Sequence, residues 1–148
     1  MNEKAALSEY LSQYKLNDIE VGLKKTFKVN ITESMENQFA NLTGDYSPIH
    51  VDEEYARTTN LGRRICHGML LGSFLSQLVG IHLPGKYGLC LSYSVRHLLP
   101  CFPNQEITVE GTVTEKSIAT RIITVKGTIR DSSGKLVCDS ILKVLMRE

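Results

Sequence analysis

Two different spacings of apolar residues divide this chain into a helical first half and a strand-rich second half. In the first half, three- and four-residue spacing predicts a helix over Glu33–Leu42, with Thr32 as its N-terminal cap. Asp52 is expected to cap a shorter helix over Glu53–Thr58. The buried face of the first helix is expected to consist of Met35, Phe39 and Leu42.

The segment His67–Val79 has almost no polar face. A helix that is apolar all round is normally buried all round. The segment is too short to span a membrane, so we expect the rest of the domain to wrap it. Small residues recur at every fourth position and form a narrow strip that lets another backbone or a ligand approach. They are Gly68, Gly72 and Ser76.

Apolar and polar residues alternate along the second half, which predicts β-strands over residues 89–98, 107–113, 123–129 and 136–146. A further strand is expected over Leu23–Val29, and Asp131–Gly134 is typical of a hairpin turn. Helices followed by consecutive strands indicate a single α+β domain over residues 1–148, in which an antiparallel sheet packs on a buried helix. Within it, residues 1–19 are predicted to form a short N-terminal helix or an extension.

Composition and charge narrow the possible functions. The chain has 148 residues, of which 42% are hydrophobic and 22% charged, as in globular domains. Its 17 basic and 16 acidic residues give a net charge of +1, which argues against binding to nucleic acid. We expect no membrane span and no secretory signal. The four cysteines have no metal-binding spacing, so a reducing cytoplasm is expected.

Several positions carry candidate chemistry. Asp45 and His50 are five residues apart in one short loop, and a carboxylate beside an imidazole can form an acid/base pair. Gly68 stands where the apolar helix begins, so its amide can polarise a carbonyl oxygen. Arg63 can contact a substrate phosphate or simply face solvent. By spacing alone, these residues also fit purely structural roles, as does Ser76, whose hydroxyl can bond to the preceding helical turn.

A family resemblance changes this balance. The segment Gly44-Asp45-Tyr46-Ser47-Pro48-Ile49-His50-Val51-Asp52 resembles the Gly-Asp-x-Asn-Pro-Ile-His-x-Asp signature of MaoC-like (R)-specific enoyl-CoA hydratases. Two further blocks match the family in order and spacing, namely Ile65-Cys66-His67-Gly68-Met69-Leu70 and Leu83-Pro84-Gly85. The resemblance extends from Glu20 to about Phe102 and marks Asp45 and His50 as catalytic residues.

The resemblance implies a hot-dog fold, usually dimeric, that adds water across the 2,3-double bond of an enoyl thioester without a metal or cofactor. By this resemblance Asp45 and His50 activate the water. The Gly68 amide polarises the thioester carbonyl, and Ser76 supports the site. The substrate is expected to be an acyl-CoA or acyl-carrier-protein thioester. The residues expected to contact it are Ser47, Pro48, Arg63, His67, Met69 and Tyr93.

Two other functions stay open. A thioesterase of the same fold would hydrolyse the thioester, and a non-catalytic domain would only bind acyl-CoA. The pairing of Asp45 with His50 argues against both. Ser47 stands where the family has Asn, so the support of the loop is expected to differ. Tyr93 stands where the family often has Gln, which leaves the acyl-chain length and the carrier undefined.

Overall fold

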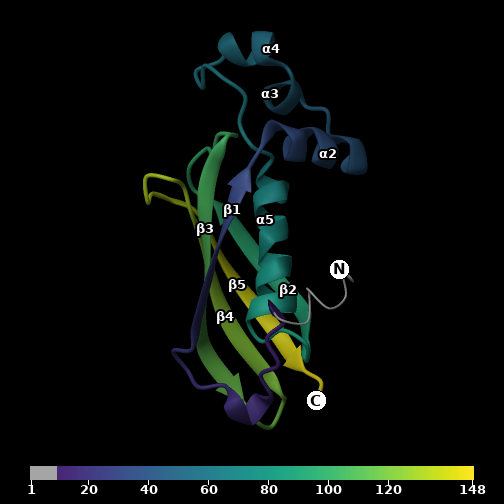
Figure 1. The fold of residues 1–148 in the computed structure, drawn as a ribbon, viewed down its shortest axis with the longest axis vertical. Coiled ribbons are helices and arrows are strands. Elements are labelled where there is room, and N and C mark those ends of the chain that lie inside the picture. Colours follow the sequence, from purple (N-terminus) through teal and green to yellow (C-terminus); the bar gives the residue numbers. More distant parts are fainter. Residues whose placement is uncertain (1–9) are drawn as a thin grey trace.

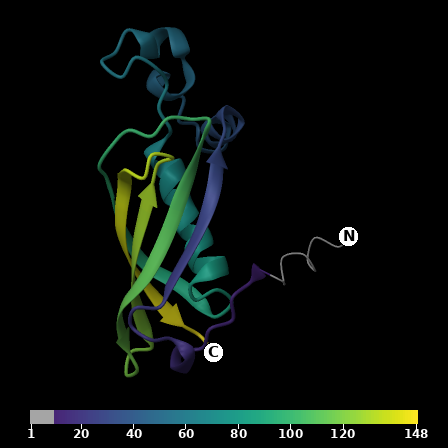
Figure 2. The same cartoon turned by 60° about the vertical axis from the view of Figure 1, so that its left-hand side comes forward.

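A computed structural model describes residues 10–148. Its five strands form one antiparallel sheet in the order β1-β3-β4-β5-β2. The strands are β1 (Lys24–Ile31), β2 (Gly88–His97), β3 (Gln105–Ser117), β4 (Ile122–Arg130) and β5 (Leu136–Met146). The helix α5 (Gly68–Gln77) runs along one face of this sheet in both views (Figures 1 and 2). This arrangement confirms the predicted α+β class with a sheet around a central helix.

Glycines on two neighbouring strands let α5 approach the sheet closely. Gly111 of β3 and Gly127 of β4 are paired in register. A Cβ atom at Gly127 would lie 2.9 Å from Cδ2 of Leu75 in α5. A Cβ atom at Gly111 would lie 2.8 Å from Cδ2 of Leu78, which begins the π-helical turn η2 (Leu78–His82) after α5. The leucines therefore pack into a dent where the sheet has no side chains.

The prediction that the central helix is buried all round is wrong for the single chain. Leu71 and Leu75 are buried against the sheet, but Met69 is 65% exposed and Ser76 also faces outward. The reason is that one sheet covers only one side of a helix. The neighbouring edge strand β2 is exposed along most of its length as well. Among residues 10–148, no helix is both long and apolar enough to cross a membrane.

Three short helices gather beyond the end of the sheet at which α5 begins (Figure 1). They are α2 (Glu33–Thr43), α3 (Pro48–Val51) and α4 (Glu53–Arg57). The predicted caps are confirmed, because Thr32 Oγ1 accepts the Met35 N–H at 3.2 Å and Asp52 Oδ1 accepts the Tyr55 N–H at 3.0 Å. The segment expected to be a loop through His50 instead turns helical at Pro48, whose fixed φ suits a first helical position.

The buried face of α2 differs from the predicted one. Leu42 is 84% exposed, and Met35 and Phe39 are only partly buried. The fully buried residues of α2 are Glu36 and Ala40. The helix is rotated relative to the expectation because the Glu36 carboxylate points inward to a partner from another segment, a contact that hydrophobic spacing does not reveal.

Residues 11–23, which precede β1, pack on the core without a long helix. Residues 11–15 are not helical, and Gln13 forms an isolated bridge with Gly85. Leu16, in the 3-10 turn η1 (Leu16–Asp18), and Ile19 are buried. The rest of the helix predicted within residues 1–19 falls on residues 1–9, outside the described part of the chain.

Candidate active site

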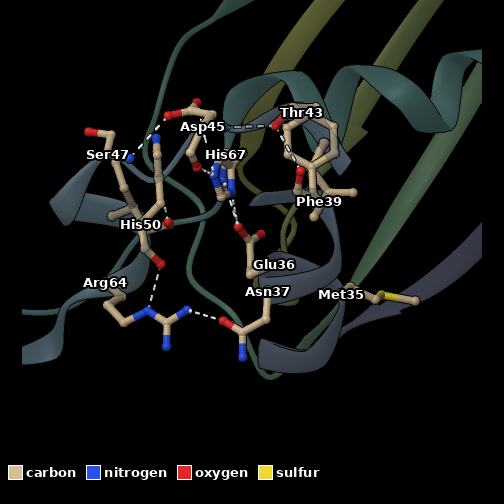
Figure 3. Close-up of polar contacts among 12 residues, drawn as sticks. Met35, Glu36, Asn37, Phe39, Thr43, Asp45, Ser47, His50, Arg64 and His67 are labelled. Carbon is tan, nitrogen blue, oxygen red and sulfur yellow. Dashed lines mark hydrogen bonds and ion pairs between the residues drawn. The ribbon is translucent and has the colours of Figure 1, made fainter. Parts of the chain in front are cut away.

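Local turn geometry brings Asp45 and His50 together. Gly44 ends α2 with a φ of 77°, a conformation that glycine adopts without strain. Asp45 Oδ1 then accepts the Ser47 N–H at 3.1 Å, and Pro48 starts α3, which carries His50. The Asp45 side chain is 49% exposed, while His50 is half-buried. Figure 3 shows the Asp45 carboxylate above the edge of the His50 ring.

Backbone contacts fix the orientation of His50. Its Nδ1 lies 2.9 Å from the carbonyl oxygen of Ile65, which can only accept a hydrogen bond, so Nδ1 carries a proton. In the neutral ring the other nitrogen, Nε2, is then free to act as a base. Arg64 supports the same turn, because its Nε donates to the His50 carbonyl at 2.6 Å and its Nη2 donates to Asn37 of α2 at 3.1 Å (Figure 3).

A buried ion-pairing contact lies directly beneath this turn. Glu36 and His67 are almost completely inaccessible to solvent, with the His67 Nδ1 2.5 Å from Glu36 Oε2. The other ring nitrogen of His67 lies 2.9 Å from the Asp45 carbonyl oxygen. The His67 ring also stacks on the His50 ring, with centroids 4.1 Å apart. His67, which we expected to contact substrate, is thus buried inside the protein, and the sequence pattern carries no signal for its partner Glu36.

Asp45, His50 and His67 place possible metal-ligand atoms within 4.8 Å of one another. Their geometry, however, does not favour chelation. The two imidazole planes are inclined by only 26° at a centroid distance of 4.1 Å, so their in-plane lone pairs do not converge at the ~2.0–2.1 Å expected for zinc. Both nitrogens of His67 also have hydrogen-bond partners. The cluster is therefore better described as a hydrogen-bonded unit.

The start of α5 lies beside this unit. No protein acceptor within residues 10–148 takes the Gly68 N–H, which is typical of a first helical turn. A Cβ atom at Gly68 would lie 3.0 Å from both Cε1 and Nε2 of His97, at the end of β2. His97 Nδ1 lies 3.2 Å from the Cys138 Sγ, and burial raises the pKa of that thiol to about 12. Cys138 therefore stays protonated. The His97 ring turns its Nε2 side towards Gly68.

The structure separates the remaining predicted residues from the Asp45–His50 pair. Ser76 lies about 12 Å along α5 from Gly68, estimated from the helical rise. It lines a groove of about 560 Å³ between α5 and β2, together with Gly72 and Tyr93. Arg63 places its guanidinium 3.8 Å from the centre of the Phe102 ring.

Arg63 also lines a separate cleft at the α4 end of the molecule. This cleft has a volume of about 410 Å³, and three of its lining residues are arginines, Arg57, Arg63 and Arg64. Two acidic residues, Glu33 and Glu53, share it. Arg57 pairs with Glu53 at 3.5 Å and Arg64 bonds to the His50 carbonyl, so Arg63 is the guanidinium best placed to meet an anionic ligand.

The chain is similar to known proteins over most of its length. The sequence model of the MaoC like domain matches residues 16–134. An (R)-specific enoyl-CoA hydratase of Aeromonas caviae is 40% identical over 118 residues, which cover 75% of this chain and 88% of the relative. A protein of the same name from Rhodospirillum rubrum is 33% identical over 129 residues, covering 87% and 89%. The R-hydratase PhaJ1 of Pseudomonas aeruginosa superposes with a TM-score of 0.88 at 30% identity, covering 93% and 88%.

Proposed function

Because this chain belongs to the MaoC-like domain family, we propose that it adds water across the 2,3-double bond of an enoyl thioester and catalyses the reverse dehydration. The Asp45–His50 pair carries this proposal. A carboxylate oxygen and a ring nitrogen lie within 4.8 Å. Two hydrogen bonds of about 2.8 Å from one water molecule, at a tetrahedral angle, reach acceptors about 4.6 Å apart. The pair is thus spaced to hold a single water molecule.

The chemistry needs a base, a proton donor and an oxyanion site. As the water oxygen bonds to C3, a proton passes from the water to the Asp45–His50 pair. The electrons of the double bond move onto the thioester oxygen, where the free Gly68 N–H stabilises the negative charge. A proton then returns from the pair to C2, which completes the addition and restores the pair. No metal or redox step is needed for this balance.

We propose coenzyme A as the carrier of the acyl group. The relatives that cover the chain most fully are named enoyl-CoA hydratases, and Arg63 of the arginine-lined cleft can contact a phosphate group. Arg57 is paired with Glu53 at 3.5 Å and Arg64 with the His50 carbonyl at 2.6 Å. The alternative substrate is a thioester of acyl carrier protein. The groove lined by Ser76 and Tyr93 suits the acyl chain, because it is largely apolar. All four cysteines, which lie within the described residues, are free, and we place this single-domain activity in a reducing cytoplasm.

We also propose a homodimer formed through the β2 edge of the sheet. An exposed strand edge invites pairing unless charges protect it. The β1 edge carries three lysines, Lys24, Lys25 and Lys28. The β2 edge instead exposes apolar residues, with Leu91 53% and Tyr93 55% accessible. Pairing of two β2 edges would bury these side chains next to the groove between α5 and β2. It would thereby cover the acyl chain bound in that groove.

Sedimentation at micromolar concentration tests this assembly. The wild type should sediment as a dimer, and Leu91→Lys should shift it towards the monomer. The matched control is Ile118→Lys, which adds the same charge to another exposed apolar residue, in the turn between β3 and β4. A monomeric wild type, or equal effects of the two substitutions, would contradict the β2 interface.

The hydratase proposal is tested with crotonyl-CoA. The ultraviolet absorbance of the enoyl thioester should disappear without release of free thiol, and chiral analysis should identify the (R)-3-hydroxyacyl product. Asp45→Asn and His50→Ala should each lower kcat by roughly 10²–10⁴-fold, the range for lost acid/base catalysis. Release of free thiol would indicate a thioesterase, and neither signal would indicate a binding domain.

Asp52→Asn is the matched control for Asp45→Asn. Asp52 is the next carboxylate along the chain and caps α4 through its side chain. Asparagine also caps helices well, so this substitution should preserve both folding and kcat. Full hydratase activity in Asp45→Asn, or equal losses in the two variants, would remove the assigned mechanism.

A further inference from the structure

The carboxylate of Glu36 is placed where solvent cannot stabilise it. Its side chain is 0% accessible to solvent. Its partner His67, which follows 31 residues later in the sequence, has a side chain that is 1% accessible. One oxygen, Oε2, accepts both the His67 backbone N–H at 3.0 Å and the His67 Nδ1 contact at 2.5 Å. Burying such a group is costly unless it is fully paired. The contact therefore calls for an explanation beyond packing.

The hydrogen bonds of His67 define how many protons the pair must hold. Nδ1 faces the Glu36 carboxylate and Nε2 faces the Asp45 carbonyl, and both partners accept hydrogen bonds. A neutral imidazole has only one N–H. Both contacts are satisfied if His67 is doubly protonated, or if Glu36 holds the second proton and donates it to Nδ1. In either form Nε2 donates to Asp45.

We propose that Glu36 is a positioning residue for the catalytic pair and acts through His67. Glu36 supplies the carboxylate that keeps Nε2 of His67 a donor, and this donor fixes the backbone of Asp45. The His67 ring, held at both nitrogens, gives His50 a rigid surface to stack on at 4.1 Å. Figure 3 shows Glu36, His67 and Asp45 in line from α2 to the turn. This inference rests on the proposed hydratase function.

Glu36→Gln should lower activity more than an ordinary conservative substitution would. If the Gln oxygen accepts both His67 hydrogens, the neutral ring has no proton left on Nε2 for Asp45. If the Gln amide donates to Nδ1 instead, the His67 backbone N–H loses its acceptor. The amide matches the carboxylate in shape but cannot satisfy all three contacts. Glu36→Gln should therefore disturb the position of Asp45 while adding no cavity.

Kinetics on the full chain measure this effect. Glu36→Gln and Glu36→Leu should each lower kcat for crotonyl-CoA about 10-fold to 100-fold, since small displacements of catalytic groups cost up to about 10²-fold. KM should change little, because Glu36 is buried beneath the site and touches no open surface. Glu54→Gln is the matched control, because it makes the same substitution at an exposed glutamate, in α4.

A double-mutant cycle separates positioning from general destabilisation. In the Asp45→Asn background, Glu36→Gln should cost less than about 3-fold further, because residues that act as one unit lose activity only once. Multiplicative losses in the double variant, or wild-type kcat in folded Glu36→Gln, would overturn the proposal. A kcat that is normal per folded molecule after a fall in melting temperature would also overturn it.

Nitrogen-15 NMR of the histidine side chains gives a readout that needs no turnover. The wild type should show a proton on Nε2 of His67, and Glu36→Gln should shift the backbone amides from Asp45 to His50. If the wild type has no hydratase activity, the proposed function fails while this spectrum still tests Glu36. Unchanged amides in Glu36→Gln, or an unprotonated Nε2 in the wild type, would refute the positioning role.

Discussion

A methyl group added at Gly68 should stop most turnover while leaving the fold intact. The new Cβ would lie 3.0 Å from Cε1 and Nε2 of His97, closer than the 3.4–4 Å of ordinary contact. His97 is exposed at the end of β2, so its ring can move away at small cost. Alanine is also more favourable than glycine in a helix by roughly 0.5–1 kcal/mol. We therefore expect the melting temperature of Gly68→Ala to stay within about 4 °C of the wild type.

The loss of activity should appear mainly in kcat. The methyl group and the displaced ring narrow the approach of a thioester oxygen to the Gly68 N–H. Removal of one oxyanion donor costs on the order of 10²–10³ in kcat in other enzymes. The interaction strengthens as negative charge develops, so KM should change much less than kcat. Hydration of crotonyl-CoA and thermal unfolding, measured on the same sample, give both quantities.

Two further variants complete the experiment. Gly72→Ala measures the gain in helix stability alone, since a Cβ atom there would meet nothing within 4 Å. Gly68→Ala combined with His97→Ala removes the clash but keeps the methyl group beside the amide. This double variant should fold normally and stay slow. Recovery of kcat in it, or near-normal kcat in Gly68→Ala, would refute the oxyanion assignment.

Three other outcomes are expected. Gly127→Ala should lower the free energy of unfolding by about 1–3 kcal/mol in denaturant titrations, because its Cβ would clash with Ser140 Oγ and lie 2.9 Å from Leu75 Cδ2. Burial and Lys25 lower the pKa of His82, so the unfolded chain takes up a proton there first, near pH 6.5. The contribution of neutral His82 to folding stability is complete above about pH 6.5 and is lost as the pH falls towards the lower folded pKa. His82→Phe should therefore flatten the profile of melting temperature against pH in this range. Arg64→Ala should lower kcat more than it raises KM, because Arg64 holds the His50 carbonyl; an effect confined to KM would assign it to binding.

The sequence predicted the elements whose signals are local. Alternating residues located the strands β3 to β5, and the side chains of Thr32 and Asp52 located the starts of α2 and α4, because a cap acts on the next turn of its own helix. The family motif likewise predicts Asp45 and His50 within one short turn. A fixed spacing within one short segment is sufficient for such features.

Features that depend on a distant partner could not be predicted in this way. A charged residue such as Glu36 normally faces water, and the spacing within α2 does not indicate that it pairs with His67, 31 residues away. The dent made by Gly111 and Gly127 depends on the register between two strands and on a helix that precedes both. The apolar residues around α5 indicated burial on every side, but the sheet of this chain covers only one side of the helix.

These two kinds of residue have different tasks in the same site. In the proposed mechanism Asp45 and His50 carry the chemistry, and a side chain that must reach water and substrate lies on an accessible turn. An accessible turn is not rigid by itself, because little of it is packed. The turn must therefore be held by the protein packed beneath it. Glu36 and His67 hold it through a buried contact between α2 and the start of α5. The same helix start offers the Gly68 amide, so one buried pair sets the base, the nucleophilic water and the oxyanion donor in a common frame.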